Sequence, residues 1–202
     1  MLASPAHRAA VAFARGGLLA IAALLAAPRV AALARSMPAT AALGDLVAAL
    51  LPVAAFAAAG AFGGASLGRG RAGVRGFALG GLASGLVMAL VWPQLAGLTG
   101  REPLPVVVAF AVAGWAAAFG AGGGVAAWRI DRRAATALAG WFALGGAAGA
   151  LLFVAPSLAQ PLGAAGWPGP ARLLLATATS VAGLLAPFAI GGAAAGRTLG
   201  LD

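Results

Sequence analysis

The sequence predicts an all-α integral membrane protein, with six transmembrane helices arranged as three repeated helical hairpins in one bundle. Three observations support this fold class: the composition, the length of the apolar blocks and the distribution of arginine. The chain has 202 residues, of which 62% are hydrophobic and only 8% are charged. A soluble domain carries about 25% charged residues, so these few charges would not cover a water-exposed surface. We therefore expect the lipid bilayer to surround the chain.

The apolar residues form blocks of about 20 residues, the length of helix that crosses ~30 Å of hydrocarbon. Strands of a membrane barrel would alternate apolar and polar residues with a period of two. These blocks are apolar throughout, which favours helices, since a helix satisfies its own backbone in lipid. The expected spans are residues 13–33, 44–67, 74–95, 104–127, 136–158 and 172–195.

Two short motifs alternate along the chain and indicate an internal repeat. The first is Phe-Ala-x-Gly-Gly followed by an apolar run to a proline; its copies begin at Phe13, Phe77 and Phe142 and reach Pro28, Pro93 and Pro156. The second is a Gly-Gly pair shortly before an arginine, and its copies end at Arg69, Arg129 and Arg197. Recurrence at a fixed period is typical of a duplicated structural unit. The sequence thus predicts a single transmembrane domain, 1–202, with hairpin repeats at approximately 13–67, 74–127 and 136–195.

The N-terminal segment has the basic start and apolar run of a signal peptide. Because this segment forms the first copy of the repeat, we expect it to be retained. The chain also lacks lysine, asparagine and tyrosine, whose codons are rich in A and T. This absence indicates a bacterium with a GC-rich genome, and hence the bacterial inner membrane as the location.

The arginines predict the orientation of the chain, because cytoplasmic loops of membrane proteins are enriched in basic residues. Nine arginines fall in or next to the two terminal segments and the second and fourth connections, and four fall on the opposite side. The majority consists of Arg8 and Arg15 together with Arg69, Arg71, Arg75, Arg129, Arg132, Arg133 and Arg197. Both termini are therefore expected in the cytoplasm.

Glycines spaced four residues apart predict close helix packing, because small residues let helix backbones approach one another in lipid. The expected packing residues are Gly16, Gly17, Gly60, Gly64, Gly68, Gly80, Gly81, Gly85, Gly120, Gly124, Gly145, Gly146, Gly149, Gly192 and Gly196. Most of them fall toward the cytoplasmic ends of the predicted spans. We therefore expect a bundle that is tight in its cytoplasmic half and looser in its outer half.

The sequence offers few groups for chemistry. It has four acidic residues, one histidine and no cysteine, so we expect no catalytic site, no metal site and no cofactor. The arginines are dispersed between apolar blocks, which argues against a nucleic-acid surface. No ionisable residue falls near the middle of a span, which disfavours ion-coupled transport. Arg29 is expected to reach the headgroup region, with pairing to Asp45 as the alternative.

The nearest feature to a polar site is a small group of uncharged side chains toward the outer side, consisting of Gln94, Gln160, Thr177 and Ser180. Thr177 and Ser180 share a helix face because they are three residues apart. The favoured interpretation is that such hydroxyls bond carbonyls of their own helix. The alternative is a polar vestibule that opens outward.

Three two-helix repeats with a proline near one end of each odd-numbered helix make the chain similar in outline to mitochondrial carriers. Those carriers follow the proline with an acidic and then a basic residue, which form a gate. Here Pro28, Pro93 and Pro156 precede RVAAL, QLAGL and SLAQP. The gate charges are missing, so the resemblance extends to the architecture and does not imply carrier activity.

Two hypotheses for function remain. The first is a non-catalytic structural, accessory or assembly subunit that packs against other membrane-protein subunits through glycine-rich helix faces. The second is a passive channel or transporter for a small neutral solute or a lipid, with the repeats around a central path. The bundle axis discriminates between them. A continuous polar path favours transport, whereas an axis filled with alanine, leucine and phenylalanine favours the accessory role.

Overall fold

A computed structural model describes residues 4–37, 40–159 and 168–200, and all regular structure in these residues is helical. Six of the helices are long and apolar enough to cross a membrane. They are α1 (Pro5–Arg35), α2 (Ala41–Ala65), α3 (Gly70–Leu98), α4 (Leu104–Ile130), α5 (Ala135–Ala159) and α6 (Gly169–Leu199). A short 3-10 turn, η2 (Arg132–Ala134), precedes α5. The six expected spans thus correspond to six helices.

Helix ends differ from the expected spans for local reasons. α1 begins at Pro5, eight residues before the expected start. There the Oγ of Ser4 accepts a hydrogen bond from the backbone N–H of His7, and proline occupies the first helical position, two features that favour a helix start. α2 ends at Ala65, so Gly68 lies outside it. Gly68 has a φ of 70°, a left-handed conformation that suits glycine. Gly68 is therefore a turn residue and not the helix-packing residue that its spacing predicted.

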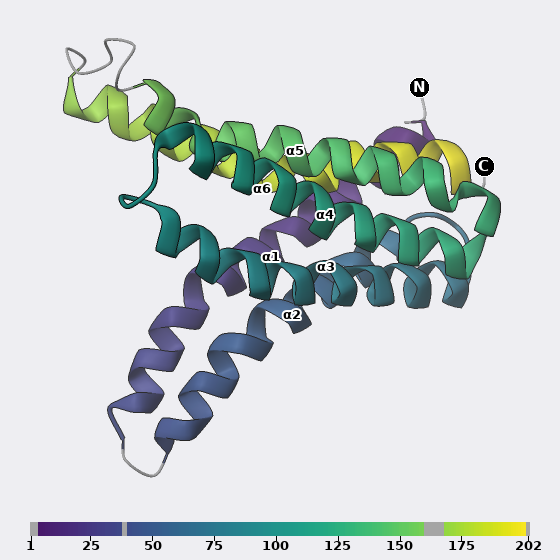
Figure 1. Ribbon diagram of the computed structural model, residues 1–202. Helices are drawn as coiled ribbons and strands as arrows, with labels where there is room; N and C mark the ends of the chain where they lie inside the picture. The colour runs from purple at the N-terminus through teal and green to yellow at the C-terminus, as the bar shows by residue number, and fades with distance from the viewer. Residues whose placement is uncertain (1–3, 38–39, 160–167, 201–202) are drawn as a thin grey trace.

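The contacts among the six helices form a closed ring, and Figure 1 shows the bundle from the side. Each helix packs on its neighbours in the chain, and α6 packs on α1 to close the ring. The short connections between α2 and α3 and between α4 and α5 keep consecutive helices side by side. The contact of α6 with α1 joins segments far apart in the sequence. A closed ring gives the bundle a central axis, which no helix occupies.

The packing of the ring differs between its two ends. We call the end that holds both chain termini the closed end and the opposite end, which holds Arg35 and residues 99–103, the splayed end. At the splayed end the α1–α2 pair diverges from the α5–α6 pair (Figure 1). In α6 every buried residue lies between Gly183 and Leu199, in the half nearer the closed end. The tight half is the one that carries the Gly-Gly pairs, as their distribution predicted.

Five of the six helices contain an internal proline: Pro28, Pro52, Pro93, Pro156 and Pro187. A proline inside a helix removes one backbone hydrogen bond and bends the helix. α1 continues for seven residues beyond Pro28, so this proline bends the helix and does not end it. In lipid the helix is retained because the remaining backbone groups have no other partner.

Candidate functional site

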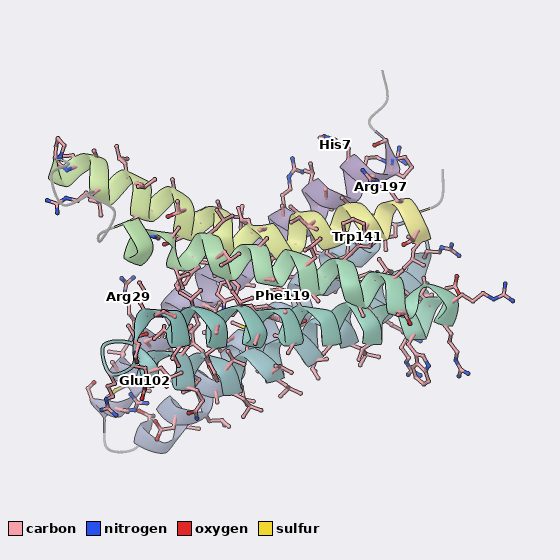
Figure 2. All side chains as sticks on the ribbon, turned by 45° about the horizontal axis from the view of Figure 1, so that its top comes forward. His7, Arg29, Glu102, Phe119, Trp141 and Arg197 are labelled. Carbon is pink, nitrogen blue, oxygen red and sulfur yellow. The ribbon has the colours of Figure 1, made fainter. Side chains whose placement is uncertain are left out.

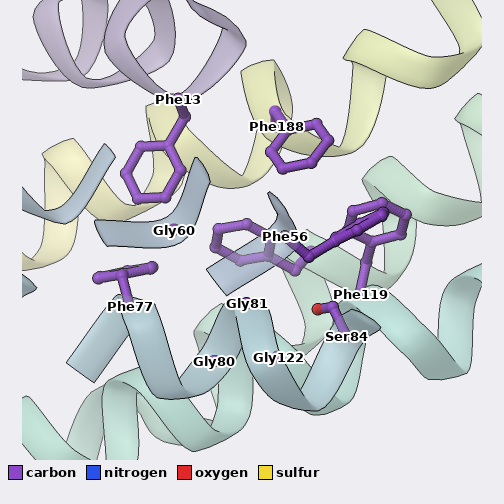
Figure 3. A pocket seen from close by; sticks show the side chains of 11 residues that line it. Phe13, Phe56, Gly60, Phe77, Gly80, Gly81, Ser84, Phe119, Gly122 and Phe188 are labelled. Carbon is purple, nitrogen blue, oxygen red and sulfur yellow. The ribbon is translucent and has the colours of Figure 1, made fainter. Parts of the chain in front are cut away.

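The axis of the closed half is filled by six phenylalanines, one from each helix. Phe13, Phe77 and Phe142 come from the odd-numbered helices, and we call them the odd triad. Phe56, Phe119 and Phe188 come from the even-numbered helices, and we call them the even triad. All six side chains are buried, with at most 6% of their surface exposed. Figure 3 shows five of these rings, labelled, turned toward the axis.

Each triad forms a closed triangle of aromatic contacts. In the odd triad the ring centroids are 4.8 Å apart for Phe13–Phe77, 6.0 Å for Phe13–Phe142 and 6.1 Å for Phe77–Phe142. In the even triad they are 5.8 Å apart for Phe56–Phe119, 5.8 Å for Phe56–Phe188 and 5.4 Å for Phe119–Phe188. These separations lie in the attractive range for aromatic pairs, each worth about 0.5–1.5 kcal/mol. Each triad therefore ties three helices together across the axis.

Glycine pairs on the odd-numbered helices allow the ring to close around these side chains. In each pair the first glycine faces the helix that follows it in the ring, and the second faces the helix that precedes it. The contacts are Gly16 with Ala59, Gly80 with Gly122 and Gly145 with Pro187 for the first glycine, and Gly17 with Phe188, Gly81 with Phe56 and Gly146 with Trp115 for the second. A Cβ added at any of the six would come within 3.0 Å of its neighbour. Five of these six glycines meet backbone atoms of the neighbouring helix, and Gly17 meets the ring of Phe188.

The other predicted packing glycines are placed as follows. Gly60 and Gly64 face α3, Gly85 faces α2, Gly120 faces α5, Gly149 faces α6, and Gly192 and Gly196 face α1. A Cβ on Gly124 would meet only the Cβ of Ala139, at an ordinary distance of 3.4 Å. Tight positions of α4 include Gly122 and Gly123, of which Gly122 faces α3 and Gly123 faces α5. These glycine faces contact other helices of the same chain.

A small cavity of about 20 Å³ remains on the axis between the triads. It is lined by the six phenylalanines, by glycines of α2, α3 and α4, and by Ser84 (Figure 3). Ser84 is the one polar side chain in this lining and is 5% exposed. A cavity of this size has room for about one water molecule. The closed half therefore contains no continuous polar path among the described residues.

Most charged side chains lie toward the two ends of the bundle (Figure 2). Among the described residues there is no group of three His, Asp or Glu side chains able to hold a metal ion. The one ion pair in this part of the chain joins Arg35 to Asp45 at the splayed end, with 2.9 Å between Nε and Oδ1. The alternative that paired Asp45 with Arg29 was thus wrong, since Arg35 lies closer to the start of α2.

The structure does not gather the residues of the predicted polar vestibule into one site. Gln94 on α3 and Thr177 on α6 are both exposed, and Ser180 is half-buried. The helices α3 and α6 are not neighbours in the ring. Gln160 lies outside the described residues. Nearby, Thr179 donates to the carbonyl of Leu175 at 2.8 Å, the bond to the same helix that such hydroxyls make.

The arginines selected for topology all lie at the closed end, and they have different surroundings. Arg69 donates from Nε to the carbonyl oxygen of Leu199 at 2.6 Å, which links the α2–α3 connection to the last turn of α6. Arg75 and Arg129 line one groove between α3 and α4. The guanidinium of Arg132 lies 4.9 Å from the centre of the Trp128 ring. Arg71 and Arg133 are exposed. Arg197 borders a pocket with Trp141, and both are labelled in Figure 2.

The even triad was not found by sequence reasoning. The odd triad is visible as the first residue of a repeated motif, although the sequence did not show that these rings meet. Phe56, Phe119 and Phe188 precede the closing arginines of their helices by 13, 10 and 9 residues, so they share no fixed offset. Their signal is one phenylalanine per even helix on the axial face, which is weak in a chain rich in alanine and glycine.

Comparisons with protein-family models, curated proteins and solved structures find no match to this chain.

Proposed function

We propose that this chain is a non-catalytic, multi-pass membrane protein that acts as a structural, accessory or assembly subunit. The observation that carries the proposal is the filled axis. Six phenylalanine rings occupy the space that a transport path would need, and the cavity among them measures about 20 Å³. Most charged groups lie toward the ends of the bundle (Figure 2), and Arg15, at the level of the odd triad, is exposed on the outer surface. An axis of this kind stabilises a bundle and provides neither a path nor a reactive group.

The proposal includes three hairpin repeats related by a threefold arrangement. Its support is the equivalence of positions around the ring: every helix pair contributes one ring to each triad. The same first-glycine and second-glycine rule holds in all three odd-numbered helices. Duplication of one hairpin accounts for both regularities, because each copy of the unit would direct one phenylalanine per helix to the axis and one glycine of each pair to each neighbouring helix.

The proposal also places the protein in a bacterial inner membrane with both termini in the cytoplasm. Nine arginines at the closed end against four elsewhere support this orientation. A reporter that fluoresces only in the cytoplasm is expected to give full signal when fused after residue 202. A reporter active only in the periplasm is expected to give full signal when inserted at Gly100, in the connection between α3 and α4. The opposite pair of results would overturn the orientation.

Partner contact is assigned to the splayed end, because the glycine faces of the closed half are already packed within the chain. The far half of α2 exposes Leu46 and Leu50, each at 52%. A photo-crosslinking residue placed at either position in cells is expected to give one adduct of discrete mass. Leu18 and Leu19, exposed at 50% and 56% in the closed half, serve as controls and are expected to give none. No adduct from Leu46 or Leu50, or the same adduct from all four positions, would count against the assignment.

The closed ring favours a passive channel or transporter for a small neutral solute or lipid as the second candidate. Hydrophobic constrictions can gate a pore, and the two triads form such a constriction. Liposomes that contain the protein discriminate between the two functions by their swelling in glycerol. If the protein has only an accessory role, liposomes that contain it are expected to swell at the same rate as protein-free liposomes. A faster rate that falls when Ser84→Thr adds one methyl group to the axial cavity would establish the channel and exclude the accessory role as the sole function.

A further inference from the structure

A groove between α3 and α4 at the closed end carries two arginines above an apolar floor. It has a volume of about 500 Å³ and is lined by Ala72, Arg75, Gly76, Ala78, Leu79 and Arg129, which we call the arginine groove. Gly76 is buried against Ile130, and this close approach of α3 and α4 forms the floor. Leu79, 40% exposed, lies one turn from Arg75, on the side toward the middle of α3. Charge and apolar surface are thus adjacent in one groove.

Neither groove arginine has an acidic partner in the part of the chain that the structure describes. The one ion pair there, Arg35 with Asp45, lies at the splayed end. Asp131 is the nearest carboxylate in sequence to Arg129, and its Oδ1 accepts a hydrogen bond from the backbone N–H of Arg133. Two like charges that line one groove repel each other, so an anion bound between them is favoured. The groove therefore lacks a counter-charge from these residues.

The pair of arginines is specific to the middle of the chain. Arg75 stands two residues before Phe77, and the equivalent positions before Phe13 and Phe142 are Val11 and Gly140. Among the arginines that end the second motif, Arg69 already donates a hydrogen bond to the carbonyl oxygen of Leu199. Arg75 also lies five residues inside α3, and not in a connection. An excess of basic residues in cytoplasmic loops does not by itself explain an arginine inside a helix.

We propose that the arginine groove binds the headgroup of an anionic phospholipid. Arginine matches phosphate oxygens with paired hydrogen bonds, and basic pockets between membrane helices hold anionic headgroups. The apolar floor and Leu79 lie where the acyl chains enter the bilayer. The phosphate sits between Arg75 and Arg129, and the lipid chains follow the α3–α4 surface. This inference rests on the membrane location proposed above and does not depend on the accessory role.

The experiment titrates phosphatidylglycerol into the purified protein in mild detergent and counts bound lipid by native mass spectrometry. The double variant Arg75→Gln/Arg129→Gln is expected to bind about 30-fold more weakly, since each arginine near the surface contributes a factor of about five. The matched control Arg132→Gln/Arg133→Gln removes the same charge at the same end and is expected to bind as the original chain does. Phosphatidylcholine and inorganic phosphate are expected to bind weakly, and to bind equally to all three proteins.

Three results of this titration would overturn the proposal. One is unchanged binding by the groove variant, and another is an equal loss in both double variants, which would indicate a diffuse surface charge. The third is saturation by inorganic phosphate alone, which would make the site one for a free anion. A measurement on the unaltered chain keeps the test independent of folding of the variants. Phosphatidylglycerol with a photoreactive acyl chain is expected to label the α3 segment around Leu79, and labelling confined to other helices would contradict the site.

Discussion

The double variant Gly60→Ala/Gly81→Ala is expected to lose the packed α2–α3 contact and with it much of the stability of the ring. A Cβ on Gly60 would overlap the carbonyl oxygen of Phe77, and a Cβ on Gly81 would overlap that of Phe56. Both obstacles are backbone atoms, so no side chain can rotate away and the helices must separate. Overpacking of this kind costs about 1–3 kcal/mol at each position. Heating in detergent followed by size-exclusion chromatography is expected to show a clearly lower midpoint of unfolding.

The matched control for this prediction is Gly97→Ala, on the same helix as Gly81. A Cβ at Gly97 has no atom within 4 Å, and alanine favours the helical backbone. We therefore expect an unchanged or slightly higher midpoint for this variant. If the Gly60 and Gly81 substitutions left the midpoint where Gly97→Ala leaves it, the close α2–α3 approach would not exist in the folded protein.

The sequence predicted the helices well because the solvent determines them. A chain with 8% charged residues and apolar blocks of membrane length must satisfy its backbone hydrogen bonds internally, and apolar blocks without alternation do so as helices. The six candidate spans match the six helices. The errors occur where the local backbone conformation ends a helix although the glycine spacing continues. Gly68 continues the four-residue spacing of Gly60 and Gly64, yet α2 ends before it and the chain turns there. Spacing alone does not show where a helix stops.

The site was less predictable than the fold because it depends on contacts around the ring. The closure of α6 on α1 brings Phe13 against Gly192 and beside Phe142, and no pattern within one helix reports that contact. The glycine pairs were visible as a motif, but their use depends on geometry. The two glycines of one pair face different helices, because adjacent positions on a helix point about 100° apart. The groove at Arg75 and Arg129 joins residues from two helices, and sequence analysis assigned both only to topology.

The second large effect concerns the odd triad, in which Phe13→Ala, Phe77→Ala and Phe142→Ala are expected to destabilise the protein to similar degrees. Each substitution leaves a cavity of roughly 100 Å³, and at about 24 cal/mol per Å³ the cost is about 2 kcal/mol. The unfolded chain stays in detergent or lipid, so little transfer free energy is added to this packing loss. Similar values at three positions 64 and 65 residues apart are what equivalent repeats require.

The control for the triad is Phe62→Ala on α2, because Phe62 is 50% exposed on the outer surface of the ring. Its removal exchanges one contact with lipid for another, and we expect almost no change in the midpoint of unfolding. The pair Phe13→Ala/Phe77→Ala is expected to cost less than the sum of its single variants, since the two rings touch at 4.8 Å and each single substitution already removes their contact. Full additivity, or a loss at Phe62 as large as that at Phe13, would show that the axis does not hold the ring together. The three hairpins would then owe their association to the glycine faces alone.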